Sequence, residues 1–237
     1  LKGGAFAEYI CAPAQVCGRM SEGAGFAEMA STPIAGLTAL QALVTHGKLK
    51  EGESVLINGA SGGVGHFAVQ IAKAYGAKVT GVCSSRNQEF VKILGADEAL
   101  AYDQENIHHH QGQYDLVLDT HGNLFLQDFK RMGKRGVVVG FTTLKHMMQL
   151  LISAGFSKFP LAQFTAAANT EDLETLADLI RDKKVNVHIE KTYPHHKIPE
   201  AIGYIEAMRT RGKVAMVWEG AEEVEGVNKV AESITHQ

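Results

Sequence analysis

The chain has few of the features that mark several large classes of protein. Its 23 Lys and Arg against 26 Asp and Glu give a net charge of −3, which argues against the basic surface that nucleic-acid binding needs. No apolar run reaches the roughly 18 residues that a membrane span requires, so we expect no such span. Only three cysteines occur, Cys11, Cys17 and Cys83. Their odd number and irregular spacing favour reduced thiols and a cytoplasmic location.

Templates for side-chain catalysis and metal binding are also scarce. The Gly-x-Ser-x-Gly spacing at residues 59–63 is interpreted as part of a phosphate-binding turn rather than as the motif that carries a serine nucleophile. Histidines cluster at residues 108–110 and 195–196, but the side chains of neighbouring residues diverge. We therefore interpret both runs as solvated loops rather than metal ligands. His121, at the end of a predicted strand, is interpreted as a core or rim residue, with a place bordering a cofactor as the alternative. The sequence predicts no metal site and leaves the catalytic side chain unknown.

The most informative stretch is a glycine-rich turn between two apolar segments. Residues 55–57 predict a buried parallel strand, and the turn at residues 59–65 follows it directly. A helix to about Tyr75 comes next, and residues 78–82 predict a second strand. Glycines let the backbone approach a diphosphate closely, and the new helix presents free N–H groups and the positive end of its dipole. This βαβ unit predicts a nucleotide-binding turn, with a tight structural turn as the alternative.

Strands and helices continue to alternate on both sides of this unit. The pattern predicts an α/β fold, a doubly wound parallel sheet of the Rossmann type over residues 32–166. A helix is expected from Thr32 and Pro33 towards Gly47. Further strands are expected at residues 99–102, 116–118, 137–139 and 159–166, and further helices at 87–94, 124–132 and 147–154.

Two segments outside this range predict a second, smaller domain. Residues 1–31 contain one expected strand, at residues 6–11. Residues 167–220 predict, in order, a helix, a β-like stretch, a helix and a strand, at 171–182, 185–193, 198–208 and 213–218. Residues 221–237 form an acidic tail with apolar positions at helical spacing. We expect a terminal helix lying on the body, with partner binding as the alternative.

The end of the second strand of the βαβ unit indicates the cofactor. A carboxylate at this point would favour NAD, because it accepts hydrogen bonds from the adenosine ribose. This sequence has Ser84, Ser85 and Arg86 instead, and hydroxyls with a guanidinium suit a 2′-phosphate. NADPH is therefore the predicted cofactor. In the alternative, Arg86 is a solvated residue in the first turn of a helix, where its charge opposes the helix dipole.

With these residues in view, the chain resembles the medium-chain dehydrogenase/reductase (alcohol dehydrogenase-like) superfamily, and within it the zinc-independent quinone oxidoreductase branch. Six segments carry the resemblance in the family's order: GGAFAEY (3–9), PIAGLTA (33–39), NGASGGVG (58–65), LGAD (94–97), YDLVLD (114–119) and GKV (212–214). The resemblance implies that residues 1–31 and 167–220 are part of a GroES-like substrate domain. Members of the family have a long further segment at the N-terminus, so we expect the sequence to be a fragment of a longer protein.

The resemblance also implies roles for individual residues. Thr38 would lie near the nicotinamide phosphate or ribose, and the backbone of Ala60, Ser61, Gly62, Gly63 and Val64 would hold the diphosphate. Ser84, Arg86 and Tyr102 would surround the 2′-phosphate. Gly140, Phe141 and Thr142 would lie beside the nicotinamide, and Lys213 would return towards the cofactor cleft.

The expected function is NADPH-dependent hydride transfer to a quinone or a related α,β-unsaturated carbonyl, with a small-molecule acceptor and no protein nucleophile. Zinc is not expected, because the segment before Gly36 is apolar where the zinc-dependent branch supplies a ligand. Two alternatives stay open, an enoyl-thioester or alkenal double-bond reductase and a non-catalytic NADPH-binding protein. The resemblance further implies a homodimer or homotetramer.

Overall fold

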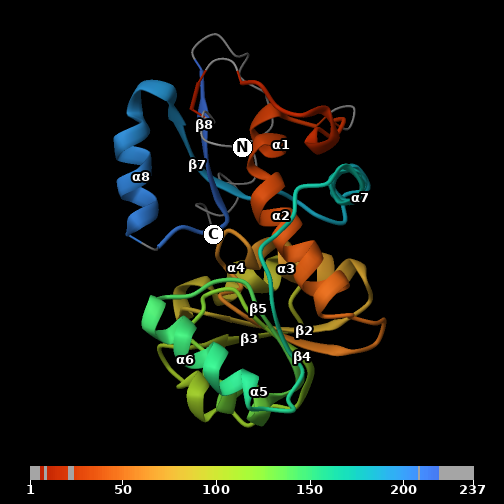
Figure 1. The fold of residues 1–237 in the computed structure, drawn as a ribbon. Helices are drawn as coiled ribbons and strands as arrows, with labels where there is room; N and C mark the ends of the chain where they lie inside the picture. The colour runs from red at the N-terminus through yellow and green to blue at the C-terminus, as the bar shows by residue number, and fades with distance from the viewer. Residues whose placement is uncertain (1–5, 8–9, 21–23, 208, 219–237) are drawn as a thin grey trace.

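The computed structural model describes residues 6–7, 10–20, 24–207 and 209–218. Its larger part is a six-stranded parallel sheet with helices on both faces (Figure 1). A two-stranded parallel sheet lies beside it with a helix of its own. In the described part of the chain, no helix is long and apolar enough to cross a membrane.

The six strands follow the order β3-β2-β1-β4-β5-β6, and every neighbouring pair is parallel. They are β1 (Ser54–Asn58), β2 (Lys78–Cys83), β3 (Glu98–Ala101), β4 (Tyr114–Asp119), β5 (Gly133–Val138) and β6 (Leu161–Gln163). The chain leaves the sheet in opposite directions from β1 and β4. A crevice therefore opens outside the carboxyl ends of these two strands, where sheets of this kind bind ligands. The predicted α/β fold with a doubly wound parallel sheet is confirmed.

Helices cover both faces of the sheet. The elements α2 (Pro33–Leu40), η2 (Gln41–His46, a π-helix), α3 (Gly65–Ala74) and α4 (Gln88–Ile93) lie on one face, and α5 (Leu126–Met132) and α6 (Leu144–Gly155) lie on the other (Figure 1). Side chains alternate across each strand, so Val55 and Ile57 enter the core beneath α2 and α3, whereas Leu56 enters the core beneath α5. Each such fully buried side chain contributes about 1.5–3 kcal/mol.

The smaller sheet is a second crossover unit. It comprises β7 (Ile189–Pro194), the 3₁₀ turn η5 (His195–Lys197), α8 (Ile198–Glu206) and β8 (Lys213–Val217). Polar side chains connect this region to the larger sheet. Gln70 on α3 donates to the Asn186 carbonyl at 3.0 Å and accepts from the Asn186 N–H at 2.7 Å. Gln41 makes the same pair of bonds with Ala167, just before α7 (Thr170–Arg181). Each of these pairs of hydrogen bonds holds a backbone segment, at Ala167 or at Asn186, in a fixed position against a helical element of the larger part.

Several predicted elements differ from those in the structure. The strand expected at residues 6–11 is wrong for its described residues, which form a turn and irregular backbone. Phe6 and Ile10 are exposed, and none of the described strands covers them. The expected helix from Thr32 to Gly47 is divided into α2 and η2, and α1 (Phe26–Ser31) precedes it unpredicted. The strand expected at residues 159–166 shortens to β6, and the stretch at 185–193 is extended only from Ile189.

The other described elements are short 3₁₀ turns, η1 (Ala14–Val16), η3 (Ser85–Asn87) and η4 (Ile107–His109). The helix predicted in the acidic tail, residues 221–237, lies outside the described residues. The division of the chain into two domains stays a prediction.

Candidate functional site

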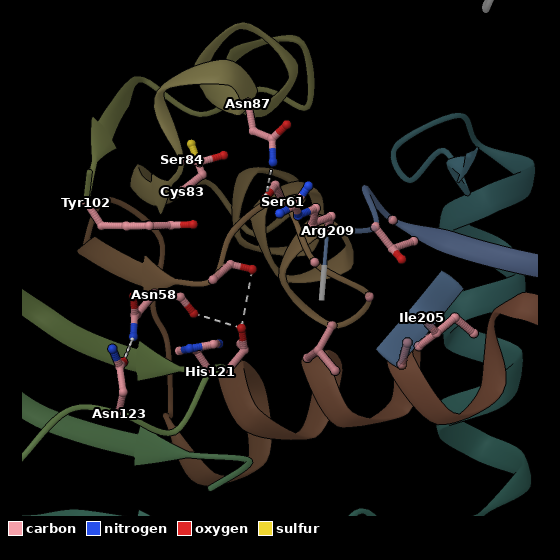
Figure 2. Close-up of a pocket in the computed structure, with 18 of the residues that line it drawn as sticks. Asn58, Ser61, Cys83, Ser84, Asn87, Tyr102, His121, Asn123, Ile205 and Arg209 are labelled. Carbon is pink, nitrogen blue, oxygen red and sulfur yellow. Dashed lines mark hydrogen bonds between the residues drawn. The ribbon is translucent and has the colours of Figure 1, made fainter. Parts of the chain in front are cut away.

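A cleft of about 760 Å³ opens at the carboxyl ends of β1, β2, β3 and β4. Its lining comes from the glycine turn after β1, the residues after β2 and the connection from β3 to β4. The end of α8 and the start of β8 supply residues from the smaller sheet. Figure 2 shows Tyr102, Cys83 and Ser84 towards one end of the cleft and Ile205 towards the other, with Ser61 between them. The cleft thus lies between the two sheets, over the switch in strand order.

At two positions of the glycine turn, the backbone leaves room only for glycine. Gly59 has φ +83°, in the left-handed region, and a Cβ on Gly65 would lie 2.0 Å from the Gly59 carbonyl oxygen. Gly65 therefore lets the start of α3 pack directly against the turn. Within the described residues, the backbone N–H groups of Gly63 and Val64 have no hydrogen-bond acceptor. These N–H groups at a helix N-terminus are suited to an anion.

Lys213 brings a positive charge to the same turn. The Gly212 N–H donates to the Ser61 carbonyl at 2.9 Å, which holds the start of β8 against the turn. A Cβ on Gly63 would lie only 3.9 Å from the Lys213 Nζ. Burial lowers the pKa of Lys213, and no described residue hydrogen-bonds to its ammonium group. A phosphate oxygen at the turn would supply the missing counter-charge.

Two hydroxyls that line the cleft are buried without a partner. Neither the Ser84 Oγ nor the Thr210 Oγ1 has a hydrogen-bond partner among the described residues. A buried polar atom without a partner costs about 1–3 kcal/mol. The unpaired hydroxyls, the free N–H groups and the Lys213 ammonium all fit a phosphorylated nucleotide in the cleft.

Arginines and an asparagine surround the end of β2. The Arg86 guanidinium donates to the Arg209 carbonyl over a long 3.5 Å, and Asn87 donates to the Ser61 Oγ at 3.1 Å. Ser85 is engaged elsewhere, because its N–H and Oγ both donate to Asp103, at 2.8 and 2.7 Å. These bonds lower the pKa of Asp103. The Asp103 carboxylate, which interacts electrostatically with Arg86, is therefore already held by Ser85.

A buried carboxylate orders the backbone after β4. Asp119 is fully buried and accepts from the side chain of Asn58 at 2.8 Å. It also accepts from the N–H groups of His121, Gly122 and Leu124 at 2.8–3.0 Å. Asn58 donates as well to Asn123, at 2.7 Å (Figure 2). Asp119 therefore satisfies three backbone N–H groups and one side-chain amide, and it holds the backbone after β4 in place at this wall of the cleft.

The structure gathers eight of the predicted cofactor residues in the cleft: Ser61, Gly62, Gly63, Val64, Ser84, Arg86, Tyr102 and Lys213. It does not place the other six in the lining: Thr38, Ala60, Ser85, Gly140, Phe141 and Thr142. The hydroxyls of Thr38 and Thr142 donate to the carbonyls of Ile34 and Gly122, both at 2.6 Å. Ala60 is fully buried beneath the turn.

The prediction missed lining residues from four regions: Ile34 on α2, His108 between β3 and β4, Thr120 and Asn123 after β4, and Ile205, Arg209 and Thr210 before β8. His121, interpreted as a core or rim residue, also lies in the lining. Ile34 is 78% exposed in the structure, but it belongs to an apolar helix pattern, so the sequence carried no signal for its place in the cleft. The others reach the cleft through tertiary packing, which the local pattern does not indicate.

Histidines occupy two distinct environments near the site. His66 on α3 is fully buried, with its Nδ1 at 3.1 Å from the Gly62 carbonyl. Burial lowers its pKa to about 4. His108 places its Nδ1 at 2.7 Å from the Asp128 carboxylate. Among the described residues, no three His, Cys, Asp or Glu side chains form a group that could hold a metal ion.

Comparison with known proteins identifies the family. Residues 94–216 match the family described as "Zinc-binding dehydrogenase". The chloroplast envelope quinone oxidoreductase homolog of Arabidopsis thaliana is 35% identical over 213 residues, covering 85% of this chain and 65% of the relative. The mitochondrial NAD(P)H oxidoreductase RTN4IP1 of Bos taurus is 32% identical over 251 residues, covering 91% of this chain and 61% of the relative. The chain belongs to the medium-chain dehydrogenase/reductase superfamily, in its quinone oxidoreductase branch.

A solved structure of the superfamily has the same fold. The quinone oxidoreductase from Coxiella burnetii has a TM-score of 0.75 and 30% identity, covering 84% of this chain and 62% of that one. The predicted family is confirmed. The chain spans less than two thirds of the length of these relatives. The relatives are named for a chloroplast envelope and a mitochondrion, so the cytoplasmic location stays a prediction.

Proposed function

We propose that this chain forms the cofactor-binding part of an NADPH-dependent oxidoreductase that reduces a quinone or a related α,β-unsaturated carbonyl. The observation that carries the proposal is the meeting of Lys213 with the glycine turn. The Lys213 ammonium group faces a helix N-terminus, and neither it nor the N–H groups of Gly63 and Val64 have a hydrogen-bond partner among the described residues. This combination favours a diphosphate. The names of the plant and bovine relatives, a quinone oxidoreductase homolog and an NAD(P)H oxidoreductase, support the same activity.

The end of β2 supports NADPH over NADH. The residue after this strand is Ser84, where NAD-binding proteins of this fold have a carboxylate. Its buried hydroxyl has no hydrogen-bond partner in the described part of the chain. Arg86 lies two residues further on and also lines the cleft. A guanidinium and a hydroxyl together suit a 2′-phosphate. Because Ser85 holds the nearby Asp103 carboxylate, that negative charge is partly compensated before a phosphate arrives.

When bound, the reduced nicotinamide supplies a hydride to the acceptor. The residues of this chain bind and orient the reactants. Ile34, Ile205 and Val214 give the cleft an apolar wall from α2, α8 and β8, which suits a planar acceptor ring. Thr38 and residues 140–142 remain proposed neighbours of the nicotinamide, and no side chain is assigned as a proton donor. The proposal includes no zinc, because the first residues of α2, 33–35, are apolar and offer no ligand.

Binding and turnover test the proposal separately. Calorimetry with the purified chain measures the dissociation constants of NADPH and NADH, and we expect NADPH to bind more tightly. NADPH oxidation is then followed by the loss of the absorbance of the reduced nicotinamide, with a panel of quinones and enones as acceptors. Turnover of quinones is the expected result, and turnover of enones alone would favour the double-bond reductase. NADPH binding without oxidation by any acceptor would favour a non-catalytic binding protein. The homo-oligomer remains a proposal of its own.

A further inference from the structure

A histidine–aspartate pair lies in the wall of the cleft beyond the 2′-phosphate residues. His108 lines the cleft, and its side chain is 34% exposed. Its Nδ1 lies 2.7 Å from Oδ2 of Asp128, at the start of α5. The His108 ring also lies 5.8 Å from the ring of Phe125. The ring is therefore held at one edge, and its other edge belongs to the exposed part of the side chain.

Asp128 determines which nitrogen of His108 carries the proton. The carboxylate is buried and accepts hydrogen bonds from the Phe125 N–H at 2.9 Å and from Arg131 at 2.8 Å. Burial raises the pKa of Asp128, but the bonds from Phe125, Arg131 and His108 outweigh it and hold the pKa below its usual range. An ionised carboxylate only accepts hydrogen bonds. Nδ1 is therefore the donor, and in the neutral ring Nε2 keeps a lone pair that can accept.

The position of His108 in the chain places it near the base of a bound dinucleotide. The connection between β3 and β4 supplies Tyr102, Ile107 and His108 to the cleft, beside the Ser84 and Arg86 end of β2. In NADPH the adenine is attached to the same ribose that carries the 2′-phosphate. A phosphate beside Ser84 and Arg86 therefore brings the base to this connection. The exposed ring of Tyr102 offers a stacking face, and Ile107 adds an apolar contact.

We propose that His108 accepts a hydrogen bond at Nε2 from the 6-amino group of adenine, so that the cleft selects adenine over 6-oxopurines. A 6-oxopurine presents a carbonyl oxygen at this position, and two acceptors facing each other repel. Asp128 acts as the positioning residue, because it fixes the ring and its tautomer. The inference rests on the proposed function, since it requires a bound dinucleotide. It holds for NADPH and NADH alike, because both contain adenine.

The test compares NADPH with its deaminated analogue, in which hypoxanthine replaces adenine. Calorimetry on the full chain measures both dissociation constants. We expect the analogue to bind about tenfold more weakly, the scale of one hydrogen bond with an unpaired acceptor. His108→Leu should weaken NADPH by a similar factor and remove the difference between the two ligands. His109→Leu is the matched control, because His109 is exposed and lies outside the lining, and it should keep the difference.

Equal affinities of the unsubstituted chain for the two ligands would overturn the inference, and this comparison does not depend on any variant folding. A difference that persists in a folded His108→Leu variant, checked by circular dichroism, would overturn it as well. Failure of the chain to bind either dinucleotide would instead overturn the proposed function. The two failures are therefore distinguishable.

Discussion

Arg86 lies beside Ser84 where β2 ends, and its guanidinium makes a long hydrogen bond of 3.5 Å to a backbone carbonyl. Its charge is therefore free to pair with a 2′-phosphate. We predict that Arg86→Ala weakens NADPH binding by about 1–3 kcal/mol, the scale of a charge-assisted hydrogen bond, and leaves NADH almost unchanged. Calorimetric titration of both cofactors measures the two losses. An equal loss for both would mean that Arg86 does not contact the 2′-phosphate.

Lys92 provides the control for this substitution. It is an exposed cation on α4, close to Arg86 in the chain, but it does not line the cleft. Lys92→Ala removes the same net charge from the same region. It should leave the preference between NADPH and NADH unchanged, which would separate a direct contact from a long-range effect of charge.

For single residues, the sequence indicated which residue types suit the cofactor better than it indicated where each side chain lies. Ser84 and Arg86 were predicted as a pair and both line the cleft, because the end of β2 directs them there. Ser85 was predicted with them, but its hydroxyl bonds to Asp103, eighteen residues further along the chain. That contact depends on the pairing of β2 with β3, which adjacent residues do not reveal. His108 went unrecognised for the same reason, because its partner Asp128 lies on α5.

The element that the site depends on is the turn from β1 into α3. A Cβ on Gly65 would lie 2.0 Å from the Gly59 carbonyl oxygen, and this backbone contact has no room to relax. We predict that Gly65→Ala lowers the free energy of unfolding by about 1–3 kcal/mol, the usual cost of overpacking. The displaced helix N-terminus should also lose dinucleotide binding. Urea denaturation and calorimetry measure the two effects.

Gly203 on α8 is the matched control for Gly65. It is a helical glycine, and outside its own helix backbone no described residue has an atom within 4 Å of the position that a Cβ would occupy. Gly203→Ala should stabilise the chain by up to about 1 kcal/mol, because alanine has the higher helix propensity. A Gly65→Ala variant as stable as the Gly203→Ala variant would contradict the tight contact at the turn.

Elements with local signals were predicted well, and those that need distant partners were not. The glycine turn, β1 and α3 follow from spacing within one short stretch. The strand expected at residues 6–11 has a suitable composition, but Phe6 and Ile10 find no neighbouring strand in the described part of the chain. A strand exists only with a partner, whereas a helix satisfies its backbone internally. This explains why the strands of the parallel sheet were predicted, whereas the strand at residues 6–11 was not found and the edge strand β6 is shorter than expected.

At the scale of the whole molecule, α3 lies between the six-stranded sheet and the segment leading to β7. Gln70 bonds to Asn186 across this contact, and His66, one turn earlier, is fully buried. Burial lowers the pKa of His66 to about 4, and the nearby His188 and Lys213 contribute in the same direction. Burial lowers the pKa of His188 as well. Proton binding to these histidines therefore opposes the packing of the two parts of the chain.

This arrangement makes the stability of the molecule depend on pH. Between about pH 6.5 and pH 4 the unfolded chain protonates His66 and the folded chain does not, so stability falls as the pH falls. We predict a loss of about 3 kcal/mol from His66 over this range. His66→Gln should make the pH dependence shallower by that amount, measured by urea denaturation at several pH values. His109→Gln, at an exposed histidine, should leave the slope unchanged, and the same result for His66→Gln would refute the prediction.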